Sequence, residues 1–172
     1  RIGFPIAVSG VLFPAIYMIL IRLPAEYGAH QVAALRIGHT MEGMSFFLAM
    51  GISLAVGPIV GQNLGAGKAA RAARGVWLAV AMTTGALIIF SIAFALFPDS
   101  LSAIFTTDRE TIAAGAVYLR ILAFSQVFMG LEIVLGGAFS GAGDTLPPMI
   151  VNVPLNLARI PIAFLLAHFF GW

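Results

Sequence analysis

Five long apolar segments, separated by short polar stretches, make up most of the chain. They span about 2–21, 33–60, 76–97, 113–139 and 148–170. A helix needs roughly 20 mostly apolar residues to cross the hydrocarbon of a membrane, so each segment is long enough. In lipid, backbone polar groups must be bonded internally, which only helices and closed barrels achieve. No segment shows the short alternating pattern of a barrel strand, so we predict an all-α polytopic membrane protein with about five transmembrane helices.

The composition agrees with a chain whose outer surface faces lipid. Of 172 residues, 60% are hydrophobic and 9% charged, against about 25% charged residues in soluble domains. The net charge of +2 gives no indication of a nucleic-acid partner. The absence of cysteine excludes thiolate chemistry and cysteine-based metal sites. The first apolar segment is too long for the core of a signal peptide, and the start at Arg1 suggests a fragment of a longer chain.

The loops between the apolar segments differ in charge, which predicts their sidedness. The Lys68–Arg74 connection carries three basic residues and no acid, whereas the Asp99–Glu110 connection is acidic overall. Basic loops stay on the cytoplasmic side, so we predict that Lys68–Arg74 is cytoplasmic and Asp99–Glu110 external. In the external loop, Thr107 or Asp108 is placed to serve as N-cap of the next helix.

The stretch 61–68, GQNLGAGK, resembles a phosphate-binding loop at first sight. In such a loop the first glycine would stand at position 62 and a Ser or Thr after the lysine, but the chain has Gln62 and Ala69 there. The stretch also follows a predicted membrane helix and not a strand. We therefore predict no nucleotide site here.

The glycines of this stretch indicate helix packing instead. Gly57, Gly61 and Gly65 are spaced by four, so they share one helical face. Small residues at that spacing let the backbones of membrane helices approach closely. Gly65 and Gly67 are then expected to turn the chain at the membrane edge.

Several motifs together resemble the multidrug and toxic compound extrusion (MATE) family of cation-coupled exporters. They are VGQNLGAGKAARAAR and FSGAGDTLPP, supported by AHQVAALRI, MEGMSFFLAMGIS and NLARIPIAFLLA. The resemblance implies twelve helices in two pseudo-symmetric lobes. The five helices here would begin the second lobe, and its sixth helix and the whole N-terminal lobe would be missing. Among the motif residues, a structural role is expected for Gly61, Gln62, Gly65, Gly67, Gly141, Gly143 and Asp144.

The same resemblance implies a function. It implies a secondary antiporter, not an enzyme, that exports small lipophilic or cationic compounds in exchange for protons or sodium ions by alternating access. It would need no cofactor, and would lie in a membrane of the bacterial inner (plasma) type, in contact with lipid and with the N-terminal lobe. An isolated lobe is expected to be poorly stable.

Polar residues at helical spacing mark three of the predicted helices. Such residues are costly in a membrane and usually functional, so we expect the three faces to converge on a protein interior or a watery cavity. The faces comprise Glu42, Ser45, Ala49, Ser53 and Gly57; Ser125, Met129, Glu132, Gly136 and Ser140; and Asn152, Asn156, Arg159 and Ala163.

Glu132 is the main candidate for coupling or substrate binding, and we hypothesise that it approaches Arg159 within ion-pair reach. The alternative is a carboxylate locked to Arg159 that never titrates. For Glu42, in the outer half of its helix, a structural or interfacial role is favoured over transport. Some family members carry an acidic residue in the first helix of this lobe, but this chain has Phe13 or Pro14 at that position. Such members also carry an Asp on the helix that matches 113–139, and that position falls near Met129 here. The candidate cavity residues are Glu42, Ser125, Met129, Glu132, Asn152, Asn156 and Arg159.

Other classes of protein stay open as alternatives. A relative that flips lipid-linked oligosaccharides would need several cationic cavity residues, and few are available besides Arg159. An intramembrane metal hydrolase would use His30, His39 and His168 with Glu42 or Asp144, but no HExxH-type spacing is present. A purely structural membrane subunit is disfavoured by the three polar faces.

Overall fold

The computed structural model describes residues 3–21 and 28–170, and these residues form α-helices without any strand. The prediction of an all-α chain is confirmed. The predicted start of the first helix at Ile2 lies outside the described residues. The helices of the described part are α1 (Gly3–Leu20), α3 (Ala29–Gly65), α4 (Ala69–Leu96), α5 (Pro98–Ala103), α6 (Arg109–Ala142) and α7 (Leu146–Phe170).

Each of the five predicted segments has a helix, and α3, α4 and α6 are longer than their apolar cores; α4 begins at Ala69, ahead of the predicted start at 76. α3 and α6 extend by several residues into polar sequence at both ends, since helix ends follow caps and turns and not hydropathy. The sequence pattern missed the short helix α5, which begins with Pro98 and has Asp99 in its first turn. Proline at the first helical position and an acid near the positive end of the helix both favour such a start.

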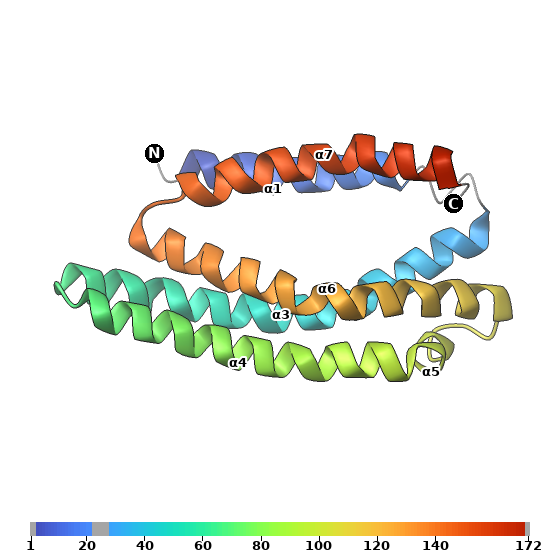
Figure 1. Ribbon diagram of the computed structural model, residues 1–172, viewed down its shortest axis with the longest axis horizontal. Helices are drawn as coiled ribbons and strands as arrows, with labels where there is room; N and C mark the ends of the chain where they lie inside the picture. The colour runs from blue at the N-terminus through green and yellow to red at the C-terminus, as the bar shows by residue number, and fades with distance from the viewer. Residues whose placement is uncertain (1–2, 22–27, 171–172) are drawn as a thin grey trace.

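The helices form two layers (Figure 1). α3, α4 and α6 pack side by side as a bundle, and α5 packs against α6. α1 and α7 pack against each other and form a second layer, which has few direct contacts with the bundle. The two layers therefore leave an opening between the α1–α7 pair and the helices α3 and α6.

Glycines bring α3 and α6 together at close range. A Cβ atom added to Gly141 would lie 2.3 Å from the carbonyl oxygen of Gly57, and one added to Gly61 would lie 3.1 Å from the carbonyl oxygen of Gly141. A Cβ on Gly137 would lie 2.7 Å from the carbonyl oxygen of Ser53. Gly57, Gly61, Gly137 and Gly141 are called the glycine seam below. The predicted close packing is confirmed for Gly57 and Gly61.

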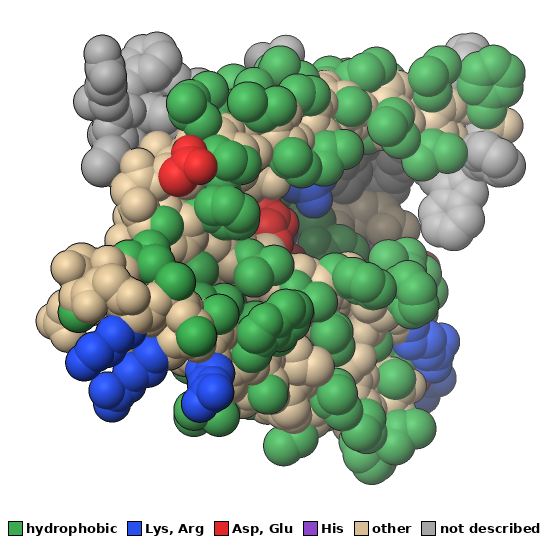
Figure 2. Space-filling view, turned by 60° about the vertical axis from the view of Figure 1, so that its left-hand side comes forward, with side chains coloured by type: hydrophobic (Ala, Val, Ile, Leu, Met, Phe, Trp, Pro, Cys, Tyr) green, Lys and Arg blue, Asp and Glu red, His purple; other side chains and the backbone are tan. Residues whose placement is uncertain are grey.

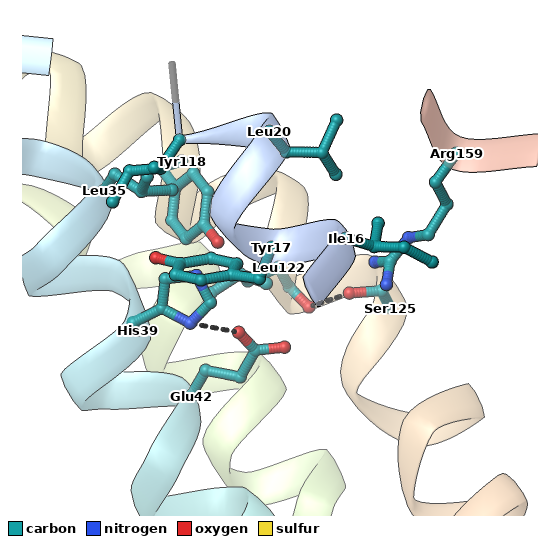
Figure 3. A pocket seen from close by; sticks show the side chains of 11 residues that line it. Ile16, Tyr17, Leu20, Leu35, His39, Glu42, Tyr118, Leu122, Ser125 and Arg159 are labelled. Atoms are coloured by element: carbon teal, nitrogen blue, oxygen red, sulfur yellow. Dashed lines mark hydrogen bonds and ion pairs between the residues drawn. The ribbon is translucent and has the colours of Figure 1, made fainter. Parts of the chain in front are cut away.

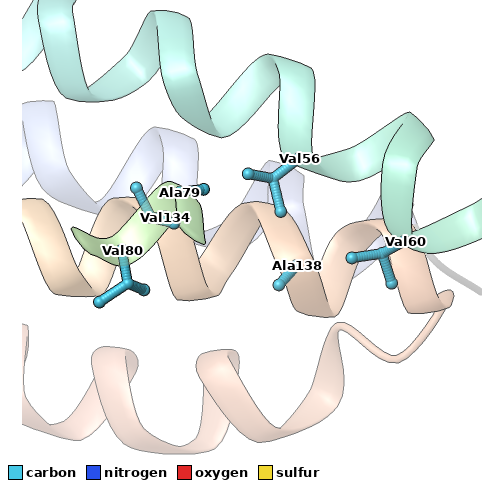
Figure 4. Close-up of a cluster of buried hydrophobic side chains, with 6 residues drawn as sticks. All are labelled: Val56, Val60, Ala79, Val80, Val134 and Ala138. Atoms are coloured by element: carbon cyan, nitrogen blue, oxygen red, sulfur yellow. The ribbon is translucent and has the colours of Figure 1, made fainter. Parts of the chain in front are cut away.

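Apolar side chains fill the bundle on both sides of the seam. One cluster joins α3, α4 and α6 near their loop ends, as Figure 4 shows; its buried members are Val56, Val60, Ala79, Val80, Val134 and Ala138. A second cluster lies toward the other end and comprises Met41, Phe94, Leu119, Leu122 and Ala123. Burial of this apolar surface against neighbouring helices gives the bundle its dispersion contacts.

Buried hydroxyl groups add hydrogen bonds between the helices. Ser45 of α3 donates to the side-chain oxygen of Gln126 on α6 at 2.6 Å, and both side chains are fully buried. Ser53 of α3 donates to the backbone oxygen of Ile133 on α6 at 2.8 Å. Interhelical bonds of this kind hold membrane helices together where no hydrophobic force acts between them.

The two GAG motifs end their helices in the same way. Lys68 N–H donates to Asn63 O at 2.8 Å and Gly67 N–H to Leu64 O at 2.9 Å, which is a Schellman motif with Gly67 at φ 71°. At the end of α6, Asp144 N–H donates to Phe139 O and Gly143 N–H to Ser140 O, both at 3.1 Å, with Gly143 at φ 78°. The positive φ explains the glycine at each position, and the expectation that Gly67 turns the chain is confirmed.

The outer surface of the described helices is apolar enough for lipid. Four helices are long and apolar enough to cross a membrane, namely Ala29–Gly65, Ala69–Leu96, Arg109–Ala142 and Leu146–Leu166. α1 contributes a shorter apolar stretch, Gly10–Leu20. Large side chains such as Trp77, Phe124 and Phe128 lie exposed on these helices, as expected of a surface that faces lipid.

Candidate functional site

A cavity of about 270 Å³ lies between the two layers and is the main candidate site (Figure 3). α1 and α7 form one wall, and α3 and α6 form the other. It is called the inter-layer cavity below, and its lining residues are Ile16, Tyr17, Leu20, Ile21, Leu35, His39, Glu42, Tyr118, Leu122, Ser125 and Arg159.

An ion pair on α3 forms the acidic part of the cavity. His39 and Glu42 are three residues apart, so they lie one above the other on the same helical face. His39 Nδ1 is 3.5 Å from Glu42 Oε2, and about a third of the His39 side chain and a quarter of the Glu42 side chain are exposed. Both side chains are therefore partly open to the cavity that they line.

Aromatic rings hold His39 in place. The ring of Tyr17 from α1 meets the imidazole edge-on, with centroids 4.7 Å apart and planes at 88°. Tyr118 from α6 lies on another side at 6.3 Å. The edge-to-face contact with Tyr17 is favourable for aromatic groups and joins the imidazole to the second layer, while the tilted ring of Tyr118 contacts it from the bundle.

α7 supplies the basic group of the cavity. Arg159 extends from α7 toward Ser125 and the α1 residue Ile16 (Figure 3). Its Nη1 is 3.5 Å from Asn156 Oδ1, and Asn156 donates through Nδ2 to Asn152 O at 2.9 Å. Asn152, Asn156 and Arg159 are four and three residues apart, so they share one face of α7. The guanidinium of Arg159 on this face lines the cavity.

The structure brings together three of the seven predicted cavity residues. Glu42, Ser125 and Arg159 line the inter-layer cavity. Asn152 and Asn156 lie on the α7 face behind Arg159, and are half-buried. Met129 and Glu132 lie further along α6 and do not line this cavity.

The expected ion pair between Glu132 and Arg159 is not made. Within the described residues the ion pairs join His30 to Asp108 and Glu110, His39 to Glu42, and Arg120 to Asp99. Glu132 is exposed on α6 and follows Ser125 by seven residues, which is roughly 10 Å along the helix. Because Arg159 reaches into the cavity at the level of Ser125, it lies too far along the bundle from Glu132.

Only the first residue of the predicted polar face on α3 opens on the cavity. Ser45, Ala49 and Ser53 are buried against α6, and Gly57 belongs to the glycine seam. Glu42 instead lies in the cavity, where the sequence had favoured a structural or interfacial role. Of the predicted faces on α6 and α7, Ser125 and Arg159 line the cavity, and the convergence of the rest stays a prediction.

Sequence reasoning missed Tyr17, His39 and Tyr118 as cavity residues. For His39 a signal was available, because a histidine three residues before an acid in an apolar helix shares its face. For the two tyrosines no signal existed, since their place depends on how α1 and α6 lie relative to α3.

A second polar cluster lies at the end of the bundle that holds the 106–110 loop. Asp108 is the N-cap of α6, as predicted, and accepts from Thr111 N–H at 2.9 Å and from the Thr111 hydroxyl at 2.6 Å. His30 Nδ1 lies 2.9 Å from Asp108 Oδ2. The Thr111 hydroxyl and backbone N–H, helped by His30, lower the pKa of Asp108 to about 2.

The histidines do not form the metal site of the hydrolase alternative in the part of the chain that is described. His30 faces Asp108 and Glu110, His39 faces Glu42, and no group of three or more metal-ligating side chains is found among described residues. The side chain of His168 lies outside what the structure describes.

Charged groups lie at several places on the surface in Figure 2, including a basic cluster at one end and the hollow between the layers. Lys68, Arg71 and Arg74 are exposed where α3 turns into α4, and Lys and Arg side chains cluster at that end in the space-filling view. In the same view an acidic and a basic side chain lie in the hollow between the two layers. The visible surface of the layers themselves is mostly apolar.

Comparison with known proteins places these features among membrane transporters. The MatE family model matches residues 5–165. The chain is 33% identical over 176 aligned positions to "Probable multidrug resistance protein NorM" of Thermotoga maritima, covering 99% of this chain and 37% of that protein. It is 26% identical over 178 positions to the protein of that name in Pseudomonas aeruginosa, covering 100% and 36%. It is 24% identical over 172 positions to a "FAD transporter" of Shewanella oneidensis, covering 99% and 38%. The chain thus spans less than two-fifths of these relatives.

Proposed function

The chain belongs to the MatE family, and from this premise we propose that it forms part of a membrane exporter of small lipophilic or cationic compounds. The fold is all-α, and four of the described helices are long and apolar enough to span a membrane. Relatives that align with nearly the whole of this chain are named as multidrug resistance proteins. The remaining length of those relatives leaves room for the N-terminal lobe, which would complete the transport pathway.

The observation that carries this proposal is the inter-layer cavity with charged side chains inside an apolar helical protein. Glu42 and Arg159 line it from opposite layers. Ionisable residues in membrane helices are expensive and usually mark substrate or ion pathways. A cavity with a carboxylate and aromatic rings suits an amphiphilic cation, because the ring faces and the carboxylate both attract positive charge.

Transport would be driven by an inward gradient of protons or sodium ions. The cavity would open alternately to the two sides as the α1–α7 pair moves against the α3–α4–α6 bundle, a movement favoured by the few direct contacts between the layers. We further propose that the Lys68–Arg74 loop faces the cytoplasm and the Asp99–Glu110 loop the outside, in a membrane of the bacterial inner type.

The test is gradient-driven efflux by the full-length parent protein in vesicles. A proton gradient and, separately, a sodium gradient are imposed, and export of a fluorescent lipophilic cation is followed for the wild type, Glu42→Gln and Glu132→Gln. Glu110→Gln removes an exposed acid of the other polar cluster and is the matched control. Loss of transport in Glu42→Gln, with Glu110→Gln unaffected, supports the proposal, whereas loss in Glu132→Gln alone would place the coupling residue outside the inter-layer cavity. Failure of wild type to move the cation under either gradient would overturn it and favour the lipid-flipping alternative.

An anionic cargo is a second candidate, favoured by Arg159 and by the relative named as a FAD transporter. A guanidinium binds phosphate oxygens in pairs and stacks on flat rings, and Tyr17 and Tyr118 lie in the same cavity. In the same vesicles, Arg159→Gln would abolish export of FAD and leave that of the lipophilic cation in place. If wild type exports no FAD, this candidate is rejected.

A further inference from the structure

His39 lies beside Glu42 in the inter-layer cavity, which residues of α1, α3, α6 and α7 line. Histidine is the side chain that ordinarily gains and loses a proton near neutral pH. The titratable and charged groups that face it are Glu42 on its own helix, Tyr17 from α1, Tyr118 from α6 and Arg159 from α7.

The charge of this cavity depends on the state of His39. With neutral His39, the charged groups among the described lining residues are the carboxylate of Glu42 and the guanidinium of Arg159. With protonated His39 the cavity carries an extra positive charge next to the carboxylate, at 3.5 Å. Charges at that range interact strongly where water is scarce, so a protonated His39 both repels an entering cation and occupies the carboxylate that would attract it.

We propose that His39 is the residue at which a proton and a cationic substrate compete in this half of the transporter, with Glu42 as the shared counter-charge. The proposal rests on the proposed export function, and it assigns coupling in this cavity to protons. Glu132, which the sequence made the main coupling candidate, lies outside this cavity and takes no part in the competition.

The exchange involves one proton and no covalent step. In the proton-loaded state both ring nitrogens carry hydrogen, and Nδ1–H donates to Glu42. When the cation enters, Nε2 gives its proton to water in the cavity, while Nδ1–H keeps its contact with the carboxylate. The charge of the cation replaces the charge of the proton. When the cation leaves on the other side, Nε2 takes up a proton from that side.

The first experiment is binding of tetraphenylphosphonium to the full-length protein at pH values from 8 to 5.5. In wild type the apparent Kd should rise as the pH falls, by up to about tenfold for each pH unit, since one proton competes with one cation. In His39→Gln the change should shrink to less than twofold across the range. Glu132→Gln and the control His30→Gln, which removes the exposed histidine beside Asp108, should both keep the wild-type profile.

The result that overturns the proposal is a wild-type pH profile in His39→Gln, or loss of that profile in Glu132→Gln. If His39→Gln does not fold, a second measurement on the wild-type protein tests the proposal. Wild-type protein in weak buffer should release protons when tetraphenylphosphonium is added, most strongly around the neutral range where histidine titrates. Release confined to acidic pH would point to a carboxylate and reject His39.

These outcomes are separate from a failure of the export function. If wild type binds no tetraphenylphosphonium at any pH and moves no cation in vesicles, the export function itself fails. If wild type binds and exports the cation but binding does not depend on pH, export stands and the role of His39 is rejected.

Discussion

The glycine seam and the inter-layer cavity both lie along α3 and α6 and behave in opposite ways. The seam consists of glycines four residues apart on each helix, whereas larger side chains such as His39, Glu42 and Tyr118 line the cavity on these helices. At the seam, Gly57 and Gly141 approach so closely that no side chain fits between them. At the cavity, Tyr17 and Arg159 from the second layer keep the helices apart and leave space. The difference indicates that a helical face can form a binding site only where the helix opposite does not pack directly against it.

The largest effect is expected from a methyl group at the seam. Gly141→Ala would place a carbon 2.3 Å from the Gly57 carbonyl oxygen, and backbone cannot move away as a side chain end can. Overpacking of this kind should lower the free energy of unfolding by about 3 kcal/mol. The measurement is thermal unfolding of the purified full-length protein.

The control is Gly136→Ala, five residues earlier on the same helix, where an added methyl meets nothing within 4 Å. Replacement of a helical glycine by alanine should then raise stability by about 0.5–1 kcal/mol. Equal destabilisation by both changes would mean that the seam is not packed as described.

A moderate effect is expected from loss of one hydrogen bond between the helices. Ser53→Ala removes the bond to Ile133 O, which in membrane helices is worth about 0.6–1.7 kcal/mol. Ser125→Ala removes only a bond to Leu122 O within its own helix, so unfolding should be nearly unchanged. If Ser125→Ala were the more harmful of the two, the contrast between a packed and an open face would be wrong.

The smallest effect lies outside both regions, at the N-cap of α6, and it depends on pH. Because hydrogen bonds from Thr111 lower the pKa of Asp108 from 3.8 to about 2, ionised Asp108 stabilises the folded state above pH 4. That contribution is lost as the pH falls through 4 toward 2. Asp108→Ala should therefore melt a few degrees below wild type at pH 7, and the difference should shrink steadily below pH 4. A difference that stays constant down to pH 2 would mean that the carboxylate charge has no part in it.

The helices could be predicted from the sequence because lipid imposes long apolar segments. The turn at Gly67 could be predicted because glycines follow an apolar segment there, whereas the similar turn at Gly143 is known from the structure. The partners of the polar faces could not be predicted. Hydropathy places Glu132 and Arg159 at similar depth in the membrane, but tertiary packing decides which side chains α7 brings next to α6. For the same reason Ser45 and Ser125, which look alike in the sequence, end in a buried contact and in a cavity wall.

This pair of serines gives the most direct test of the account. The chain has no cysteine, so Ser45→Cys and Ser125→Cys can each be introduced into a full-length protein freed of other cysteines and treated with a charged, membrane-impermeant thiol reagent. Only a thiol in contact with water ionises and reacts. We expect Ser125→Cys to be modified, more slowly when tetraphenylphosphonium is present, and Ser45→Cys to stay unmodified in the folded protein. Equal labelling of both positions, or labelling of Ser125→Cys that the cation does not slow, would contradict a substrate cavity between the two layers.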